Sequence, residues 1–529
     1  MNNNRLLMVQ SFRSEIPYTY MYKGLEKFRK ILIKDNPELE KWAKKEFFQI
    51  KPIWPEKPHS NAYQYGTNVS GTFIAKNIDT PTTVMGGNCT PNKILKELKK
   101  AKRQGFPYTH VGFSVFIDSY NNFMKSAEVV KDFNKKIITI AGNVGALFEK
   151  TKNYVDYVCT NDGVAFFRKL LGEDIHKPYN YCLIPSKFFL DIFEMRLKSD
   201  LVFLTTKLGC PYQCDFCGTF QIFKGKCTSP FISPQDLYQA LVDYHNQLKK
   251  DITIMFAEPT AVFPHKWWYE LFDLFREVDA DFPIIASTTP SSLYNFNFDK
   301  ISKSSLRFQV INLGIESFNK NYTKNPSIND TKPLIKKLSD YGIGTLATYI
   351  IGFDYHNREN IWQEINRLID LEASTYSVLN LKPIPKTPIW NTLKSQDRLL
   401  DIPYDLYYLQ GFQSYLHPNF KPGFEDMLPL LCQIHAHIEK ETSSITSSYI
   451  KLFETLSKTR SNKKFEKNLN KYKYFSKALY DSWESNLIPS EKQKEQYNSF
   501  IAEVNKIPLN LRLIKKSKLF RKVIQLLIH

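Results

Sequence analysis

No apolar run in this chain of 529 residues approaches the roughly 20 residues that a membrane-spanning helix needs. A secretory signal peptide is also missing, because the opening residues MNNNRLLMVQSF are too polar to supply its apolar segment. These two absences exclude the membrane-spanning and secreted classes. We therefore expect a cytoplasmic protein that is soluble or, at most, peripheral at a membrane.

Cysteine is scarce, and half of it is scattered along the chain. Four of the eight cysteines have no cysteine close to them in sequence: Cys89, Cys159, Cys182 and Cys432. Free thiols of this kind fit the reducing cytoplasm. Three others lie within eight residues, in the string GCPYQCDFCG, where Cys210, Cys214 and Cys217 form a CxxxCxxC triplet.

Three thiolates this close together are able to face one iron–sulfur cluster, one ligand short of the usual four. An iron left open would bind and reduce a small molecule, so the triplet indicates catalysis. Gly209 and Pro211 favour a tight loop, and Phe216 places an aromatic ring where it would shield the cluster from water. The alternative is a structural zinc site closed by Cys227. The missing second CxxC-like hook favours the cluster, and both interpretations stay open.

Strands and helices alternate after the cysteines. An apolar strand at 201–206 leads into the cysteine loop. Later strands are expected over 252–256, 283–287, 308–315, 344–351 and 375–381, and helices over 234–248, 266–278, 331–341 and 358–371. Such alternation is typical of parallel βαβ units, whose strands end at one common face. The cysteine loop opens that face.

This region resembles the radical S-adenosylmethionine (SAM) superfamily. The strings that carry the resemblance are LTTKLGCPYQCDFC at 204–217, FAEPTAVF at 256–263, LGIES at 313–317, YIIGFD at 349–354 and LKPIPKTPIW at 381–390. They cover roughly residues 200–400 and have the order and approximate spacing of that superfamily. The resemblance implies a partial (β/α) barrel as the core of the protein.

The resemblance also implies cofactors and a reaction. Cys210, Cys214 and Cys217 would ligate a [4Fe–4S] cluster, and its fourth iron would chelate the amino and carboxylate groups of SAM. One electron, from a donor of the flavodoxin or ferredoxin type, would cleave SAM reductively. The 5′-deoxyadenosyl radical so formed would abstract hydrogen from the substrate, while the protein supplies position and dryness.

Further residues are implied to contact SAM, position by position. They are Phe216, Glu258, Ser287, Thr288, Glu316, Ile351, Gly352 and Phe353. Glu258 would lie near the SAM amino group, and Glu316, implied to be catalytic as well, would accept bonds from the ribose hydroxyls or the amino group. Gly352 would let the adenine ring approach the backbone. Asp354 replaces the proline that is frequent at this point of the motif. The alternative is that the carboxylates are merely solvated at strand ends.

The residues before the cysteines predict another α/β unit. Strands are expected over 5–10, 110–117, 136–142 and 155–159, and helices over 120–133, 146–150 and 164–171. This doubly wound, Rossmann-like arrangement binds ligands beyond the carboxyl ends of its strands. On the strings VGFSVFIDSY, ITIAGNVGAL and YVDYVCTNDG, it resembles the cobalamin-binding domain that precedes many radical SAM cores.

The resemblance extends to cobalamin as a further cofactor. The strings TTVMGGN at 82–88 and GNVG at 142–145 hold glycines where a corrin or its nucleotide tail would approach the backbone, although ordinary βα turns look the same. No DxHxxG string is present, but many relatives lack it too. The absence of another cysteine cluster argues against members with auxiliary clusters, including methylthiotransferases. The insert at 15–66 departs from the family pattern and would cover this site.

The sequence thus predicts three domains. They are a cobalamin-binding-type domain with an N-terminal insert at 1–195, a radical SAM core at 196–400 and a basic, mostly α-helical region at 401–529. The last region shows helical spacing over 404–415 and 429–439, and its tyrosines Tyr404, Tyr407 and Tyr408 would cap the barrel mouth or simply pack. Cys432 and His435 lie three residues apart, which favours ordinary packing over metal binding.

The positive charge is concentrated at the end of the chain. Residues 451–529 contain 18 Lys and Arg against 7 Asp and Glu, within a net charge of +19 for the whole sequence. The segment 509–529 mixes basic residues with Leu and Ile at helical spacing. A solvated helix is the favoured interpretation. Binding to anionic lipid is the second, and it would suit a lipid-like substrate. Nucleic acid is an unlikely partner.

Three functions stay open from the sequence. The first is a cobalamin-dependent radical SAM methyltransferase that acts on an unactivated carbon of a small-molecule or lipid-like substrate. The second is a cobalamin-independent radical SAM enzyme that performs cyclisation, rearrangement or oxidation. The third is a degenerate, non-enzymatic metal-binding protein, against which the intact triplet and Glu316 speak.

Overall fold

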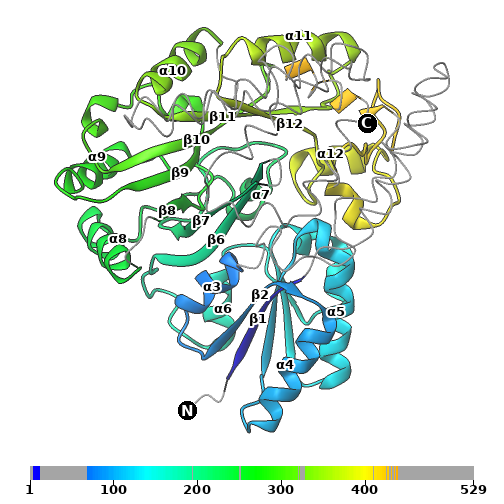
Figure 1. Cartoon of the computed structure of the whole chain (residues 1–529). Coiled ribbons are helices and arrows are strands. Elements are labelled where there is room, and N and C mark those ends of the chain that lie inside the picture. Colours follow the sequence, from blue (N-terminus) through cyan, green and yellow to red (C-terminus); the bar gives the residue numbers. More distant parts are fainter. Residues whose placement is uncertain are drawn as a thin grey trace, which may run out of the picture.

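The computed structural model describes residues 4–11, 68–192, 195–248, 252–319, 321, 328–408 and 410–423, and scattered positions between 426 and 438. These residues form two β-sheets, each flanked by helices (Figure 1). The predicted insert at 15–66 and the basic segment at 451–529 lie outside the described residues, as do Cys432 and His435.

The first sheet and its helices, called here the N-terminal unit, form a doubly wound α/β layer arrangement. Its strands are β1 (Leu6–Ser11), β2 (Thr82–Cys89), β3 (His110–Ser114), β4 (Ile138–Gly142) and β5 (Tyr157–Val158). Its helices are α3 (Val69–Lys76), α4 (Pro91–Arg103), α5 (Tyr120–Phe133) and α6 (Gly163–Leu171). All strands are parallel, in the order β2-β1-β3-β4-β5. Ligands bind such sheets where the strand order reverses, here between β1 and β3.

Both faces of the first sheet are buried, and the first four residues of β1, from Leu6 to Val9, are all apolar. Leu7 and Val9 pack with the residues of α4 and α5, whereas Leu6 and Met8 pack on the opposite side with α6. Figure 1 shows these helix pairs on the two faces of the sheet. Helix α4 begins at Pro91, and it buries Ile94, Leu98 and Ala101 at helical spacing.

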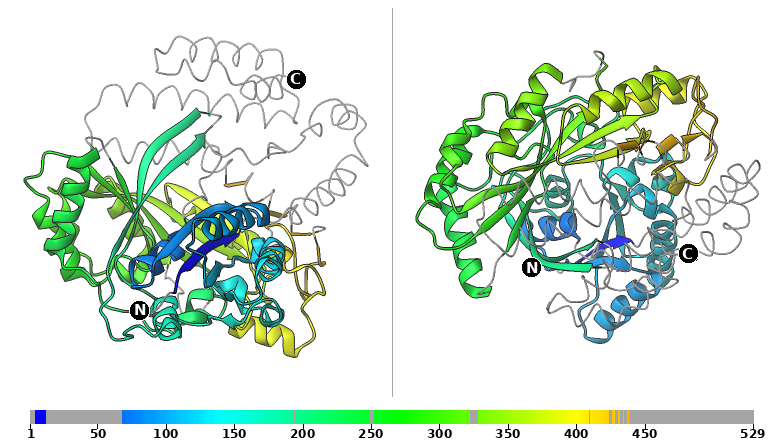
Figure 2. Two further views of the ribbon diagram at one scale, coloured as in Figure 1. Left: turned by 90° about the horizontal axis from the view of Figure 1, so that it is seen from below. Right: turned by 45° about the horizontal axis from the view of Figure 1, so that its top comes forward.

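The second sheet has seven strands in the order β12-β11-β10-β9-β8-β7-β6. They are β6 (Cys182–Ile192), β7 (Met195–Thr205), β8 (Thr253–Phe256), β9 (Phe282–Thr288), β10 (Leu306–Glu316), β11 (Gly344–Ile351) and β12 (Thr375–Asn380). β6 pairs antiparallel with β7, and every other pairing is parallel. The sheet curves but stays open between β12 and β6, and the β6–β7 hairpin extends past its neighbours (Figure 2).

Helices cover the outer face of the second sheet (Figure 1). They are α8 (Pro234–Leu248), α9 (His265–Leu274), α10 (Ile328–Asp340) and α11 (Arg358–Ile369). The largest cluster of buried residues in the described part of the chain lies between these helices and the strands, with Trp268 and Phe272 of α9 packed against Phe308 of β10. Two shorter helices lie elsewhere: α7 (Gly218–Phe223) after the cysteines, and α12 (Pro388–Ser395) after β12.

The chain returns to the N-terminal unit after α12. In the short 3-10 helix η7 (Tyr404–Tyr408), the ring of Tyr404 stacks on Phe148, with ring centroids 3.8 Å apart, and Tyr407 is buried in the same cluster. The backbone N–H of Asn121 donates to the Asp405 carboxylate at 3.2 Å. The tyrosines at 404 and 407 therefore pack against the N-terminal unit.

The predicted fold class is confirmed, and most strands and helices lie within a few residues of their predicted positions. Helix α8 and strand β11 have the predicted bounds. None of the helices in the described part of the chain has the length and apolarity needed to cross a membrane. The domain boundaries stay a prediction. β6, which precedes residue 195, belongs to the second sheet.

Residues 82–88, for which a corrin contact and an ordinary βα turn were both left open, lie in strand β2, which runs parallel to β1 and shifts register beside the glycines. Two local predictions are wrong. The helix expected at 146–150 is replaced by two short 3-10 helices, η3 (Val144–Leu147) and η4 (Glu149–Asn153). Residues 404–415 do not form the expected helix. They begin with the 3-10 helix η7, after which Gly411 turns the chain at φ 75° and Tyr415 pairs with Leu399 in a β-bridge.

Candidate active site

The cysteine loop begins where β7 ends, at the carboxyl edge of the second sheet. Cys210 and Cys214 are buried and Cys217 is half-buried, at the start of α7. The backbone N–H of Cys217 donates to the carbonyl of Cys214 at 3.1 Å, which closes a turn between them. Gly209 has φ 85°, and a Cβ there would lie 2.1 Å from the Lys226 carbonyl oxygen, so only glycine fits.

Cys227 pairs with Gly209 in a β-bridge, so it lies beside the residue that precedes Cys210. Burial raises the pKa of the Cys227 thiol. Within the described residues, no group of three His, Cys, Asp or Glu side chains is gathered closely enough to hold a metal ion. The ligand roles of the cysteine triplet, and the alternative with Cys227, both stay predictions.

Glu258 follows β8 and is bound to the backbone that leads into the cysteine loop. Its Oε1 atom accepts from the Thr206 N–H, from the Thr206 hydroxyl at 2.9 Å and from the Lys207 N–H at 3.2 Å. Its Oε2 atom is buried and has no hydrogen-bond partner in the described part of the chain. Burial raises the pKa of this carboxyl, and the bonds from Thr206 and the nearby ammonium of Lys207 oppose that rise.

Lys207 is a buried cation between the cysteine loop and the turn after β8. Its Nζ atom donates to the carbonyl oxygens of Thr260, Ala261 and Phe263. The side chain is 3% exposed, and burial lowers its pKa while the negative charge of Glu258 opposes that decrease. Lys207 therefore connects the peptide three residues before Cys210 to the turn that carries Glu258.

Several side-chain oxygens near these strand ends are buried without a hydrogen-bond partner among the described residues. Besides Glu258 Oε2 they include Asp215 Oδ1, Thr260 Oγ1 and Thr288 Oγ1. An unpaired buried oxygen costs about 1–3 kcal/mol, so a ligand that hydrogen-bonds to such a group at the edge of the site would offset that cost. Burial also raises the pKa of the Asp215 carboxyl.

The remaining predicted contact residues lie at the ends of β9 and β10. Ser287 and Thr288 end β9, and the Ser287 hydroxyl oxygen accepts from the Asn312 amide at 3.3 Å. Glu316 is the last residue of β10 and has a positive φ of 63°, beside a register shift in the pairing with β11. Glu316 is half-buried. The predicted strand-end positions of these residues thus agree with the structure.

The segment that follows β11 is held by three side chains. His356 Nδ1 accepts the backbone N–H groups of Gly352 and Phe353, each at 3.0 Å, so its proton lies on Nε2, which donates to Glu364 at 2.9 Å. The Tyr415 hydroxyl donates to the Gly352 carbonyl, and His417 donates to that of Phe353 at 2.9 Å. The predicted adenine-contacting backbone is therefore fixed rigidly.

The cysteine loop and this fixed segment contact each other directly. The ring of Phe216 packs edge to face on that of Phe353, with centroids 5.8 Å apart. The structure thus brings the cysteine loop together with the predicted adenine segment. Asp354, by contrast, faces outward, where Arg398 donates to both of its carboxylate oxygens at 2.6 Å.

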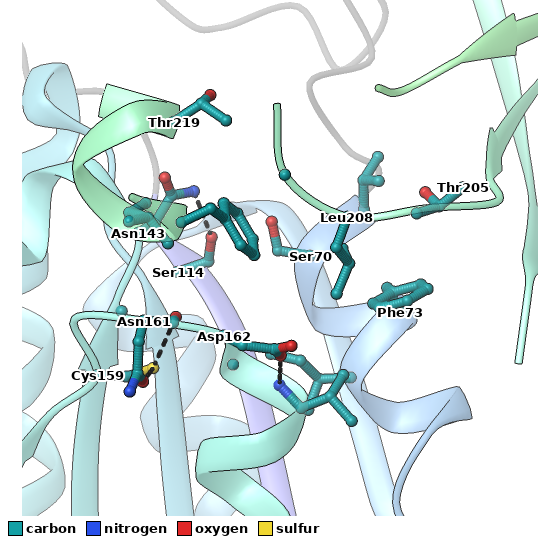
Figure 3. Close-up of a pocket in the computed structure, with 18 of the residues that line it drawn as sticks. Ser70, Phe73, Ser114, Asn143, Cys159, Asn161, Asp162, Thr205, Leu208 and Thr219 are labelled. Carbon is teal, nitrogen blue, oxygen red and sulfur yellow. Dashed lines mark hydrogen bonds between the residues drawn. The ribbon is translucent and has the colours of Figure 1, made fainter. Parts of the chain in front are cut away.

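A cavity of about 380 Å³ lies between the carboxyl ends of the two sheets (Figure 3). Its wall on the N-terminal unit includes Ser114 at the end of β3, Asn143 after β4 and Asn161 after β5. The opposite wall includes Lys207 and Glu258. Most of the remaining lining is apolar, for example Phe73, Phe113, Val164, Leu208 and Phe223. A mostly apolar cavity with a few polar groups is typical of a cofactor or small-molecule site.

The sequence did not single out three of the polar side chains that matter here. Lys207 stands inside the string LTTKLGC, and its position next to the cysteines was the available signal. Asn143 stands inside GNVG, where the two glycines are the stronger sequence signal. His356 carries no motif signal, because its role depends on where α11 places Glu364.

The comparisons with known proteins agree with this geometry. Residues 205–368 match the Radical SAM superfamily. No curated protein matches the sequence of this chain.

Solved structures resemble the fold. One is TsrM from Kitasatospora setae, a radical S-adenosylmethionine methyltransferase bound to tryptophan substrate and a SAM analogue. It is 12% identical, the match covers 76% of this chain and 96% of TsrM, and the TM-score is 0.51.

Another is OxsB, a cobalamin-dependent S-adenosylmethionine radical enzyme bound to aqua-cobalamin and S-adenosylmethionine. It is 14% identical, the match covers 83% of this chain and 73% of OxsB, and the TM-score is 0.52. At these identities the likeness concerns the fold alone. Residues 205–368 thus match the Radical SAM superfamily, and the fold of the chain resembles the folds of TsrM and OxsB.

Proposed function

We propose that this chain is a cobalamin-dependent radical SAM methyltransferase, in which Cys210, Cys214 and Cys217 hold a [4Fe–4S] cluster. The observation that carries the proposal is a cavity between the carboxyl ends of both sheets, with Glu258 on its wall. A reduced cluster would supply the electron that cleaves SAM, and cobalamin would supply methyl transfer to a carbon that lacks an activating group. OxsB, which resembles the chain in fold, is a cobalamin-dependent radical enzyme, and TsrM, which also resembles it in fold, is a methyltransferase.

The residues present fit SAM. The unpaired Glu258 Oε2 is a buried acceptor suited to a cationic amino group, and Thr288 Oγ1 is a second acceptor at the next strand end. The rigid backbone of Ile351, Gly352 and Phe353 would bind the adenine ring, and Glu316 the ribose hydroxyls. Phe216 would exclude water from the cluster through its contact with Phe353.

The residues present also fit a flat apolar ring system with polar edges. The cavity lies at the β1/β3 switch point, with Met8 and Phe113 on its wall and the amides of Asn143 and Asn161 at the strand ends. A cobalamin placed there would lie between the N-terminal unit and the peptide that leads to the cysteines. Because Glu258 also lines this cavity, the corrin and the amino group of SAM would lie close together.

The test is anaerobic purification of the full chain, followed by iron, sulfide and cobalt analysis and an absorbance spectrum. We expect about four iron atoms per chain, bound cobalamin and, with dithionite and SAM, 5′-deoxyadenosine formation. Iron without cobalamin would favour the second candidate, a cobalamin-independent radical SAM enzyme in which the cavity shapes a substrate pocket. Zinc in place of iron would contradict the radical SAM function.

Two partner proposals accompany this function. A flavodoxin or ferredoxin would deliver the electron, tested by replacing dithionite with either protein.

The segment 509–529 would contact anionic lipid, because it combines basic residues with Leu and Ile. Deletion of that segment should reduce sedimentation with anionic vesicles, and equal sedimentation would contradict membrane contact.

A further inference from the structure

Asn143 has a backbone conformation that favours glycine. It follows the last residue of β4 and has φ 74° and ψ 177°. This region of backbone space is used almost only by glycine, and other residues in it cluster at active sites and ligand clamps. The chain nevertheless has a carboxamide side chain at this position, between Gly142 and the turn that leads to Gly145.

The surrounding backbone imposes the conformation. The Val115 N–H donates to the Gly142 carbonyl and the Gly145 N–H to the Val115 carbonyl, both at 2.9 Å, and the Ala146 N–H donates to Asn143. A Cβ atom at Gly145 would lie 2.7 Å from the backbone of Val115 and Phe116. The turn therefore packs closely against the peptide after β3, and this packing fixes the backbone conformation of Asn143.

The side chain of Asn143 points toward the cavity beside Ser114 (Figure 3). Its Oδ1 atom accepts from the Val144 N–H at 2.7 Å, and its Nδ2 atom donates to the Ser114 hydroxyl at 3.3 Å. A carboxamide has two N–H donors and two acceptor lone pairs. One donor and one lone pair are therefore left for a molecule in the cavity.

We infer that Asn143 is a ligand-contacting residue, whose amide pairs with a carboxamide side chain at the edge of a bound corrin. One free donor and one free acceptor on the same group complement a primary amide, and a corrin carries such amides around its ring. The inference rests on the proposed cobalamin binding and adds a specific contact to it. The contact explains why a side chain is present where the backbone favours none.

The test compares hydroxocobalamin affinity and melting temperature of the full chain in three variants. Asn143→Gly should raise the melting temperature of the ligand-free protein, because glycine relieves the backbone strain, and should weaken hydroxocobalamin binding at least about tenfold. Asn143→Asp keeps the acceptor for the Val144 N–H and removes the N–H donors, so it should weaken binding as well. Asp397→Gly is the matched control, at an exposed residue with φ 54°. It should raise the melting temperature without changing affinity.

The outcomes separate this inference from the proposed function. Unchanged affinity in both Asn143 variants, with binding by the unsubstituted chain, would overturn the contact and leave the cobalamin function standing. A lower melting temperature in Asn143→Gly together with unchanged affinity would make the side chain a structural cap only and would also overturn it. No hydroxocobalamin binding by the unsubstituted chain would overturn the cobalamin function, and this inference with it, while 5′-deoxyadenosine formation would still report the radical SAM core.

Discussion

The ammonium nitrogen of Lys207 lies 2.6 Å from the carbonyl oxygen of Thr260. This contact joins the peptide before the cysteines to the turn after Glu258, and two further carbonyls share the same cation. Lys207→Met keeps the length of the side chain but leaves the carbonyls without a donor. We expect the free energy of unfolding to fall by about 1–3 kcal/mol, measured by urea denaturation.

The same variant should weaken SAM binding while iron content stays unchanged, because the turn that carries Glu258 loses its brace. Lys266→Met is the matched control, since Lys266 is exposed and its ion pair with Glu270, at 3.7 Å, lies on the surface of α9. Equal stability of the two variants would show that the buried contacts of Lys207 contribute nothing.

The cysteines are separable by their metal content. Cys214→Ala should abolish cluster assembly and SAM cleavage, because only two thiolates of the triplet would remain. Cys227→Ser should retain iron and 5′-deoxyadenosine formation. Iron and zinc analysis of both proteins decides between the cluster and a zinc site, and loss of metal from Cys227→Ser would support the zinc alternative.

Glu258→Gln tests the unpaired carboxylate oxygen. The amide keeps an acceptor for the Thr206 and Lys207 N–H groups but removes the charge that would face the SAM amino group. A lost charge-assisted hydrogen bond is worth about 1.5–3 kcal/mol, so SAM affinity should fall about 10- to 100-fold with iron unchanged. Glu316→Gln should weaken SAM binding in the same way. Glu270→Gln, on the surface of α9, is the control. A loss of iron from Glu316→Gln as large as its loss of SAM affinity would contradict the role of Glu316 as a SAM ligand.

Glu364 makes the stability of the adenine segment dependent on pH. Burial raises the pKa of this carboxyl, but the hydrogen bonds from His356 and Tyr349 outweigh burial and hold it below its usual value. A carboxylate with a lowered pKa stabilises the folded state above its unfolded pKa, about 4.3, and this contribution is lost as the pH falls through the folded value. Glu364→Gln should therefore be less stable than the unsubstituted chain at pH 7 by about 1–3 kcal/mol, with a smaller difference in acid.

Denaturant unfolding of both proteins between pH 7 and about pH 2 measures that difference, because the lowered folded pKa lies below the unfolded value of about 4.3. A difference that stays constant as the pH falls would show that the ionised carboxylate is not the stabilising form. Glu359→Gln, at an exposed position in the first turn of α11, serves as the control for removal of a charge from the same helix.

The second sheet was predictable because its signals are local. Each strand of the core is an apolar run, each helix has helical spacing, and the bounds of α8 agree with those expected from the sequence. The strand-end positions of Glu258 and Glu316 followed from the same alternation. β2 was missed because two glycines near the end of an edge strand resemble a turn in the sequence.

The polar contacts of the site were not predictable from local patterns. Lys207 contacts carbonyl oxygens of residues more than 50 positions away in the sequence. The orientation of His356 depends on its hydrogen bond with Glu364, which lies in α11. The conformation of Asn143 is imposed by the peptide after β3, and spacing in the sequence carries no information about a φ angle.

The packing of Tyr404 and Tyr407 on Phe148 has a consequence for synthesis of the protein. The sheet that is translated first has part of its apolar interior closed by residues that are translated more than 200 positions later. A nascent chain that has emerged only as far as β5 would leave those apolar surfaces exposed to water. The N-terminal unit therefore gains this part of its packing only after the strands of the second sheet have been translated.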